Sequence, residues 1–436
     1  MMVAPIHLCC CVILSRKILL KGDDAVNPNR WIALAVALLC GVAGYAAAPI
    51  EDRIVTSTIT LPQPLEATSS SWCTWGTCFL GPRLYLAPRS DGTHLVGWTD
   101  NTNDGHVSVV SREAIISTHT FAGKNVRGLV AHGDGTYAVL LKDGVTLFLS
   151  KRSADGSQLW ITNLNSTLAE DSSSTGDHRL AFGGGFYAAY WSVYGITGGF
   201  AGHDGDQLSY VDDSGIIQSG GWNFGCSHSM AQLVGYHSGD LEFTAFCSSD
   251  CYPQPPGLKM NYTTTIQIAD GDCHGNVSLQ LGQMAAAGTG WKVLFNAEDT
   301  PESEAYGIGF ATAGGSATTS VVWLTNTDGS TERDPVVAGL GTQDPELYLV
   351  GWTTSNDGAF HIGRVNAAGA FLEGPEHMSS SGPGWNKRDN SFATTSENSV
   401  VWLEGSAQST TLRLYRYNES IVFVCDFESG DTAPWS

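Results

Sequence analysis

One short pattern occurs near both ends of the chain, and it limits the possible folds more than any other feature. Residues 95–99 (LVGWT) are followed by NDG at 103–105, and residues 349–353 (LVGWT) are followed by NDG at 356–358. In each copy an apolar run precedes a polar turn and a second alternating run. This order predicts a β-hairpin, because Asp-Gly supplies the positive φ that a two-residue connection needs. A hairpin repeated this far apart predicts a repeated all-β module.

Less exact copies of the hairpin lie between these two. Seven candidates for the inner hairpin of a module are found, in segments 95–110, 137–149, 186–211, 232–246, 291–310, 349–365 and 400–417. Trp98 in the first and Trp402 in the last are 304 positions apart, which over six steps gives about 51 residues per repeat. A period of roughly 40 to 50 residues with four short strands is typical of propeller blades. We therefore predict an all-β fold, a β-propeller of about seven four-stranded blades, with tandem β-sandwiches as the alternative.

The composition agrees with many short strands and excludes one class of partner. Glycine is abundant at 51 residues, charged residues make up 15%, and no long segment beyond residue 50 has the apolar spacing of a helix. The formal net charge is −21. Nucleic-acid binding depends on clustered Lys and Arg, so we expect no nucleic-acid partner. An acidic surface of this kind keeps an exported protein soluble.

The N-terminal region has the order of a targeting segment. Residues 31–48 form an unbroken run of apolar and small residues, and Arg16, Lys17, Lys21 and Arg30 precede it. This pattern predicts a secretory signal peptide. An uncleaved signal anchor is the alternative, because 18 residues are just enough to span a bilayer. We predict a leader with signal peptide or anchor over 1–48, a linker over 49–70, the propeller over 71–420 and a tail over 421–436. The mature protein would be a secreted or cell-surface monomer.

Cysteines in an exported chain are expected to be oxidised. Seven of the 11 lie beyond residue 48, and Cys425 is the odd one. Close spacing favours two local disulfides, Cys73 with Cys78 and Cys247 with Cys251. Cys226 and Cys273 are then left to bridge across a blade or between blades. Spacing alone does not fix connectivity, so other pairings among the last four remain open. The six disulfide candidates are Cys73, Cys78, Cys226, Cys247, Cys251 and Cys273.

The densest group of reactive side chains lies between residues 178 and 273. Concentrated imidazole and carboxylate groups are able to ligate a divalent cation or to carry out acid–base catalysis. The candidate metal ligands are His203, Asp204, Asp206 and His228, and a divalent cation is the cofactor that they imply. An extracellular hydrolase or lyase is then the alternative function. The competing interpretation is a polar turn at a blade end, in which Asp binds its own backbone.

Aromatic and imidazole side chains in the same region, and one further tryptophan, are candidates for ligand contact. Trp222 and Trp385 lie in Gly- or Ser-rich loops, where an exposed ring can stack on a sugar or a peptide side chain. His178 and His228 complete the predicted ligand-binding set. The predicted function is a ligand-binding or interaction module for an extracellular glycan, peptide or protein.

Two short motifs resemble those of exported bacterial proteins. Residues 153–160 (SADGSQLW) resemble the Asp-Gly-x-x-x-Trp turns of secreted bacterial propellers, including quinoprotein-like ones, and the sialidase Asp box. In both families this turn packs a blade at its periphery, so the resemblance implies architecture and no catalysis. Residues 427–435 (FESGDTAPW) are similar to the Phe-Glu-Ser-Gly-Asp-Thr-x-x-Trp endings of exported bacterial proteins. The chain thus resembles secreted bacterial β-propeller repeat proteins, and no specific family is named.

Overall fold

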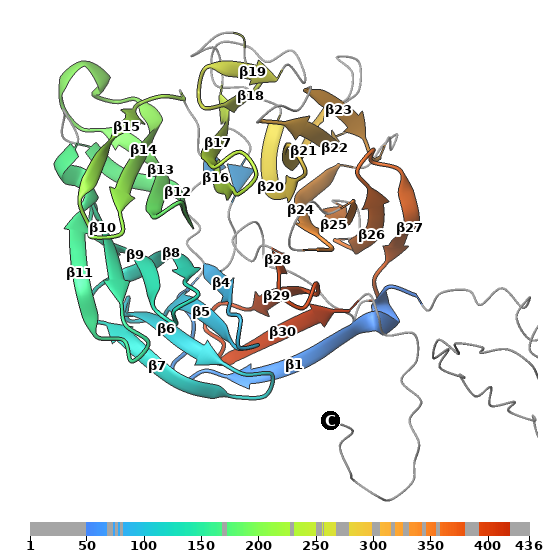
Figure 1. Cartoon of the computed structure of the whole chain (residues 1–436), viewed down its shortest axis with the longest axis horizontal. Coiled ribbons are helices and arrows are strands. Elements are labelled where there is room, and N and C mark those ends of the chain that lie inside the picture. The colour runs from blue at the N-terminus through green and yellow to red at the C-terminus, as the bar shows by residue number, and fades with distance from the viewer. Residues whose placement is uncertain are drawn as a thin grey trace, which may run out of the picture. The chain divides into compact units, whose positions relative to one another are not determined.

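Seven four-stranded antiparallel sheets follow one another around a central axis in the computed structural model (Figure 1). The fold is a seven-bladed β-propeller, as the repeat predicts. The structure describes residues 49–67, 73–74, 77–78, 82–167, 172–226, 231–249, 255, 257–266, 279–298, 306–314, 319–325, 331–341, 346–354, 358–379 and 392–418. The predicted signal segment 1–48 and the whole of the predicted tail, 421–436, lie outside these ranges.

The first four blades each contain four strands in chain order. Blade 1 contains β4 (Leu84–Pro88), β5 (His94–Thr99), β6 (Gly105–Val110) and β7 (Ile115–Phe121). Blade 2 contains β8 (Asn125–Ala131), β9 (Tyr137–Asp143), β10 (Thr146–Arg152) and β11 (Gln158–Asn163). Blade 3 contains β12 (Ser172–Gly183), β13 (Phe186–Gly195), β14 (Asp204–Asp212) and β15 (Ile217–Asn223). Blade 4 contains β16 (Gln232–His237), β17 (Glu242–Ser249), β18 (Gly257–Met260) and β19 (Thr264–Ile266).

Two further blades repeat this order, and the seventh does not. Blade 5 contains β20 (Leu279–Ala287), β21 (Gly290–Glu298), β22 (Tyr306–Ala313) and β23 (Ser320–Trp323). Blade 6 contains β24 (Glu332–Gly339), β25 (Leu347–Thr354), β26 (Phe360–Asn366) and β27 (Phe371–His377). Blade 7 contains β28 (Ala393–Thr394), β29 (Val400–Gly405), β30 (Thr411–Tyr417) and, as its outer strand, β1 (Ile54–Thr60). The first strand of each blade lies nearest the centre of the ring (Figure 1).

The ring is closed by pairing the N-terminal strand with the last blade. Strand β1 runs antiparallel to β30, with Ile54 opposite Tyr417 and Thr60 opposite Thr411. The segment 49–70 is therefore not simply a linker, as its sequence suggested, because part of it is a blade strand. Without β1 the edge of β30 would be left with unpaired backbone groups. Among the described residues, no helix combines the length and the apolar character needed to cross a membrane.

Six of the seven predicted hairpins are the second and third strands of a blade. Segment 232–246 is the exception, because it forms β16 and β17, the first and second strands. These hairpins therefore lie in the middle of the blades and not at their inner edge. Middle strands are covered by the neighbouring blades, and β5 and β6 are buried at every position. Continuous burial explains why these strands have the clearest apolar pattern.

The repeated NDG turn differs from its prediction in the first copy. The connection between β5 and β6 has five residues, 100–104, and Asn103 takes the positive φ of 68°. Gly105 already belongs to β6, opposite Thr99. A Cβ atom on Gly105 would lie 2.4 Å from the backbone oxygen of Lys124, so this glycine permits the close approach of the next chain segment. In the second copy Gly358 does have a positive φ, of 66°, as predicted.

Apolar contacts between adjacent blades form the core. Trp98 of blade 1 packs in one cluster with Val401 and Leu403 of blade 7. Trp402 of blade 7 packs in another with Val336 and Leu349 of blade 6. Each blade thus buries its faces against its neighbours, which is the packing that a closed radial array requires.

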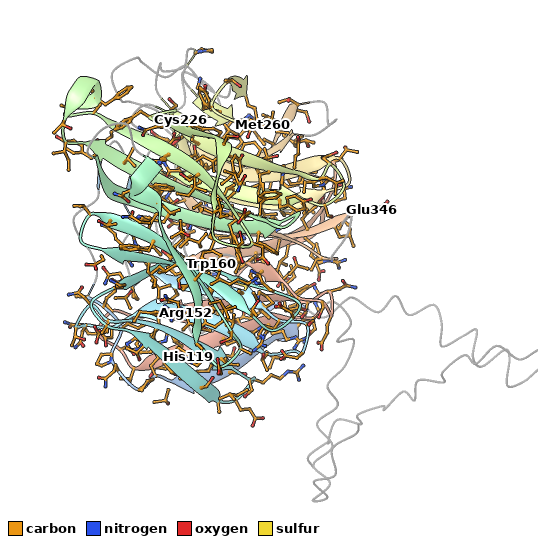
Figure 2. The ribbon with its side chains drawn as sticks, turned by 60° about the vertical axis from the view of Figure 1, so that its left-hand side comes forward. His119, Arg152, Trp160, Cys226, Met260 and Glu346 are labelled. Atoms are coloured by element: carbon orange, nitrogen blue, oxygen red, sulfur yellow. A yellow bond between two sulfur atoms is a disulfide. The ribbon has the colours of Figure 1, made fainter. Side chains whose placement is uncertain are left out.

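The Asp-Gly-x-x-x-Trp motif lies at the periphery, as the resemblance implies. Its turn is closed by hydrogen bonds from the Gly156 N–H to the Ser153 carbonyl, 2.9 Å, and from the Ser153 N–H to the Ser157 carbonyl, 3.0 Å. Trp160 in β11 donates from Nε1 to the Asp213 carbonyl of blade 3, at 3.0 Å. His119 in β7, Arg152 in β10 and Trp160 in β11 follow one another along one side of blades 1 and 2 (Figure 2). The motif therefore fastens blade 2 to blade 3.

Candidate functional site

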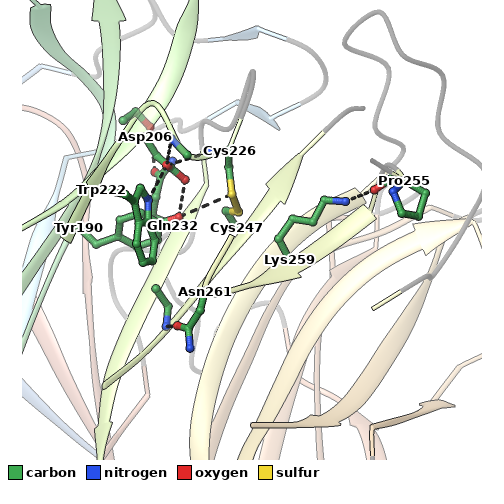
Figure 3. Close-up of a disulfide and its surroundings, with 12 residues drawn as sticks. Tyr190, Asp206, Trp222, Cys226, Gln232, Cys247, Pro255, Lys259 and Asn261 are labelled. Atoms are coloured by element: carbon green, nitrogen blue, oxygen red, sulfur yellow. Dashed lines mark hydrogen bonds between the residues drawn. A yellow bond between two sulfur atoms is a disulfide. The ribbon is translucent and has the colours of Figure 1, made fainter. Parts of the chain in front are cut away.

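Asp206, a predicted metal ligand, lies buried in β14 (Figure 3). Its Oδ1 accepts hydrogen bonds from Trp222 Nε1 at 3.0 Å and from the backbone N–H groups of Gly225 and Cys226 at 3.1 and 2.9 Å. Its Oδ2 accepts a hydrogen bond from the Tyr190 hydroxyl. Burial raises the pKa of Asp206 to about 6, and these donors oppose the rise. Four donors on one carboxylate hold the chain around residues 222–226 against β14.

A disulfide between Cys226 and Cys247 lies beside this carboxylate. Cys226 follows β15 of blade 3 and Cys247 belongs to β17 of blade 4, so the bond joins two blades. The favoured local pairing of Cys247 with Cys251 is therefore wrong, and one of the pairings left open is found. Cys251 and Cys273 are outside the described residues, whereas Cys73 and Cys78 are opposite each other in the short strands β2 (Cys73–Thr74) and β3 (Thr77–Cys78).

The acidic and cysteine groups near the disulfide do not form an open metal site. Atoms of Asp206, Cys226 and Cys247 lie within 4.8 Å of one another. Both sulfur atoms are in the disulfide, whereas cysteine ligates zinc as a free thiolate. Of the other predicted ligands, His203 is exposed before β14, Asp204 is half-buried at its first position, and His228 lies outside the described residues. The arrangement around Asp206 favours a structural role for this carboxylate.

Trp222 is also engaged within the protein. Its ring packs edge-on against Tyr190, with ring centroids 5.7 Å apart, and at a tilt against Tyr262, with ring centroids 5.0 Å apart. Together with the bond to Asp206, these contacts favour packing over ligand contact for Trp222. Trp385, its predicted counterpart, is outside the described residues. His178 is fully buried in β12, where its Nδ1 lies 3.4 Å from Arg83 Nη1.

A groove with aromatic walls lies between blades 3 and 4, and it contains none of the predicted site residues. Its volume is about 590 Å³. Phe243 packs against Tyr210 with ring centroids 5.6 Å apart and against Tyr236 at 5.0 Å. The residues that line the groove are Gly183, Gly184, Phe186, Tyr210, Gln218, Ser219, Tyr236, Leu241 and Phe243.

The turn between β12 and β13 shapes one wall of this groove. A Cβ atom on Gly183 would lie 2.0 Å from the ring of Tyr236, so only glycine lets this ring approach the strand so closely. Gly184 and Gly185 follow with φ of 59° and 82°, which glycine adopts without strain. The sequence Gly-Gly-Gly at 183–185 is therefore the local signal for this wall.

Polar groups in the groove are few. In the described part of the chain, the hydroxyls of Tyr210 and Tyr236 have no hydrogen-bond partner. Gln218 is held in place by its side-chain amide, which donates to Asp212 Oδ2 at 2.9 Å, and Ser219 is exposed. An apolar concavity with a small number of placed polar groups is the usual form of a ligand site. Sequence reasoning missed this groove because its aromatic residues come from strands of two blades.

Comparison with protein-family models and with curated proteins gives no match. Among solved structures, the Cps50 (Swd1) β-propeller domain of Myceliophteria thermophila has a TM-score of 0.39 at 9% identity, covering 76% of this chain and 95% of that one. The α-L-arabinanase of Penicillium chrysogenum, solved with arabinobiose, has a TM-score of 0.40 at 10% identity, covering 82% and 98%. A prolyl endopeptidase has a TM-score of 0.44 at 12% identity, covering 86% and 50%. Likenesses at this level leave the function to be inferred from the site itself.

Proposed function

We propose that this propeller is a carbohydrate-binding module and that its ligand occupies the groove between blades 3 and 4. The observation that carries the proposal is the set of three packed rings, Tyr210, Tyr236 and Phe243, with two phenol hydroxyls that have no partner among the described residues. Tyrosine presents an apolar ring and a polar tip, which suits a sugar with apolar C–H faces and hydroxyl groups. A volume of about 590 Å³ is within the usual range for a small ligand.

We further propose that the protein acts outside the cytoplasm, secreted or at the cell surface. The apolar run at 31–48 with its basic flank supports export. The disulfide between Cys226 and Cys247 supports an oxidising compartment, since disulfides are rare where thiols are kept reduced. The alternative of a hydrolase or lyase built on the His and Asp cluster has less support, because hydrogen bonds already occupy both oxygens of Asp206.

Glycan-array screening followed by calorimetric titration of the bound sugar tests the proposal. In the Tyr210→Phe and Tyr236→Phe variants, which keep the rings, each lost hydrogen bond should weaken binding roughly two- to tenfold. Tyr194→Phe is the matched control, because Tyr194 is an exposed tyrosine of blade 3 outside the groove and should leave affinity unchanged. Absence of any bound glycan, or equal affinity in all three variants, would contradict the proposal. Binding of peptides alone would point to a protein partner instead.

A further inference from the structure

Basic side chains on or next to the inner strands of blades 1 to 3 gather around the buried His178. These strands, β4, β8 and β12, lie next to the centre of the ring (Figure 1). Arg83 Nη1 is 3.4 Å from His178 Nδ1. Burial, and after it four positive charges, hold the pKa of His178 well below its usual value. The four cations, which we call the channel cluster, are Arg83, Arg127, Lys142 and Arg179.

Lys142 is the member of the channel cluster that the protein leaves without a counter-ion. It lies near the end of β9, opposite Asn125 of β8, which is two residues before Arg127, and it is half-buried. In the described part of the chain, its ammonium group has no ion-pair partner. Burial, followed by the charges of Arg127 and Arg83, lowers the pKa of Lys142 to about 8.

Two carboxylates hold the arginines in position. Glu66 Oε2 lies 3.7 Å from Arg127 Nη2, and its Oε1 accepts a hydrogen bond from the backbone N–H of Arg83 at 3.1 Å. Asp177 Oδ2 lies 3.2 Å from Arg179 Nη2. The side chains of Arg127 and Arg179 are 11% and 13% exposed, so their guanidinium groups are largely removed from bulk water. These contacts orient the side chains of Arg127 and Arg179, and neither carboxylate forms an ion pair with Lys142.

The backbone is irregular where these residues lie. Arg127 is the extra residue of a bulge in β8, between Val126 and Gly128. In β12 the register shifts between Thr175 and His178. A bulge bends a strand and changes the direction in which its side chains project. Similar shifts occur in β20 and β24, so the irregularity is a shared feature of these inner strands. In β8 the extra residue is the cationic Arg127, and in β12 the shift directly precedes His178 and Arg179.

An unpaired, half-buried ammonium group among other cations is costly, because its attraction to water is weakened and its neighbours repel it. The chain has 43 acidic and 22 basic residues, so a shortage of carboxylates does not explain the missing partner. A site that an external anion completes accounts both for the unpaired ammonium group of Lys142 among other cations and for its lack of a partner in a chain rich in carboxylates. Guanidinium and ammonium groups are the usual partners of carboxylate, sulfate and phosphate.

We propose that the channel cluster binds an oxyanion group, a carboxylate, sulfate or phosphate, at the inner strands of blades 1 to 3, with Lys142 as a direct contact. The proposal is independent of the sugar groove. Gly183 of the groove is five residues along β12 from His178, which corresponds to roughly 16 Å of extended strand. The groove variants therefore leave the channel cluster intact, and either site can fail alone.

Calorimetric titration with inorganic phosphate, sulfate and glucuronate, at constant ionic strength maintained with chloride, tests the proposal. Binding of the inorganic ions would indicate a free oxyanion as the ligand. Binding of glucuronate would indicate the carboxylate of an acidic sugar.

Lys142→Gln should weaken binding at least about tenfold, the loss expected for one charge-assisted hydrogen bond. Lys124→Gln is the control, because it removes the same charge from a lysine already paired with Asp143 at 2.7 Å, and it should change affinity less than about twofold. Failure of all three probes to bind, or equal affinities in both variants, would overturn the proposal.

A second measurement needs no substitution and applies even if Lys142→Gln does not fold. The folded wild-type chain is treated with an amine-acetylating reagent, with and without a saturating amount of the tightest-binding probe, and acetylation is followed by peptide mass spectrometry. The bound anion should slow acetylation of Lys142 at least about threefold and leave Lys124 unchanged. Equal rates at Lys142 in the two conditions would refute direct contact.

Discussion

At the scale of single residues, surroundings decide what a polar side chain does. Sequence reasoning selected Asp206 as a metal ligand because it follows His203 and Asp204 closely. In the structure its oxygens accept hydrogen bonds from Tyr190, Trp222 and two backbone N–H groups. These donors depend on the path of the chain after β15, which local residue types do not specify. The residue could be found from the sequence, but its role could not.

The buried state of Asp206 predicts a pH-dependent stability. Its pKa is about 6 in the folded chain against an ordinary value of 3.8. At a pH between these two values the folded protein therefore keeps a proton that the unfolded chain has released. The stabilisation from this proton is complete below about pH 4 and is lost as the pH rises through 6, a change of roughly 3 kcal/mol. We expect Asp206→Asn to lack this contribution. Urea unfolding at several pH values from about 4 to 7 measures it, and a wild-type-to-variant difference that stays constant across the range would contradict it.

At the scale of the elements, glycine at the repeated hairpin has a role that the sequence does not reveal. The LVGWT and NDG runs correctly indicate strand, turn and strand, because those signals are local. Gly105 was expected to supply the turn, yet it lies in β6 and allows the Lys124 carbonyl to come close. A contact of this kind depends on how successive blades pack, and nothing within one hairpin encodes it.

A matched pair of substitutions separates this packing role from backbone flexibility. Gly105→Ala should lower the free energy of unfolding by about 1–3 kcal/mol, because its new Cβ atom would meet a backbone oxygen 2.4 Å away that cannot move easily. Gly133→Ala is the control, since a methyl group on Gly133 would meet no atom within 4 Å and the φ of this residue is not positive. It should be neutral or stabilising by less than about 1 kcal/mol. Urea unfolding of both variants measures the difference, and equal stabilities would show that the close contact relaxes without cost.

At the scale of the whole molecule, the ring could be predicted but its closure could not. Seven hairpins with an average spacing of about 51 residues are visible in the sequence, because each hairpin pairs residues that are near neighbours. Strand β1 pairs with residues more than 350 positions away, as Ile54 opposite Tyr417 illustrates. The same limit applies to the aromatic groove and to the channel cluster, since each combines residues from two or three blades. Both proposed sites depend on contacts between repeats, and the repeat pattern alone does not contain those contacts.

Closure by β1 predicts that the segment 49–60 determines the stability of the entire ring. A chain without residues 1–60 loses Ile50 and Ile59, both fully buried, and exposes the edge of β30. Burial of each isoleucine contributes about 1.5–3 kcal/mol, so we expect a loss of roughly 3–6 kcal/mol in the free energy of unfolding, together with self-association through the open edge. A chain without residues 1–48 is the control, because it keeps β1. Urea unfolding and light scattering compare the two, and a peptide of residues 49–61 added to the shorter chain should restore part of its stability. If both truncated chains were equally stable and monomeric, pairing of β1 with β30 would not be what closes the ring.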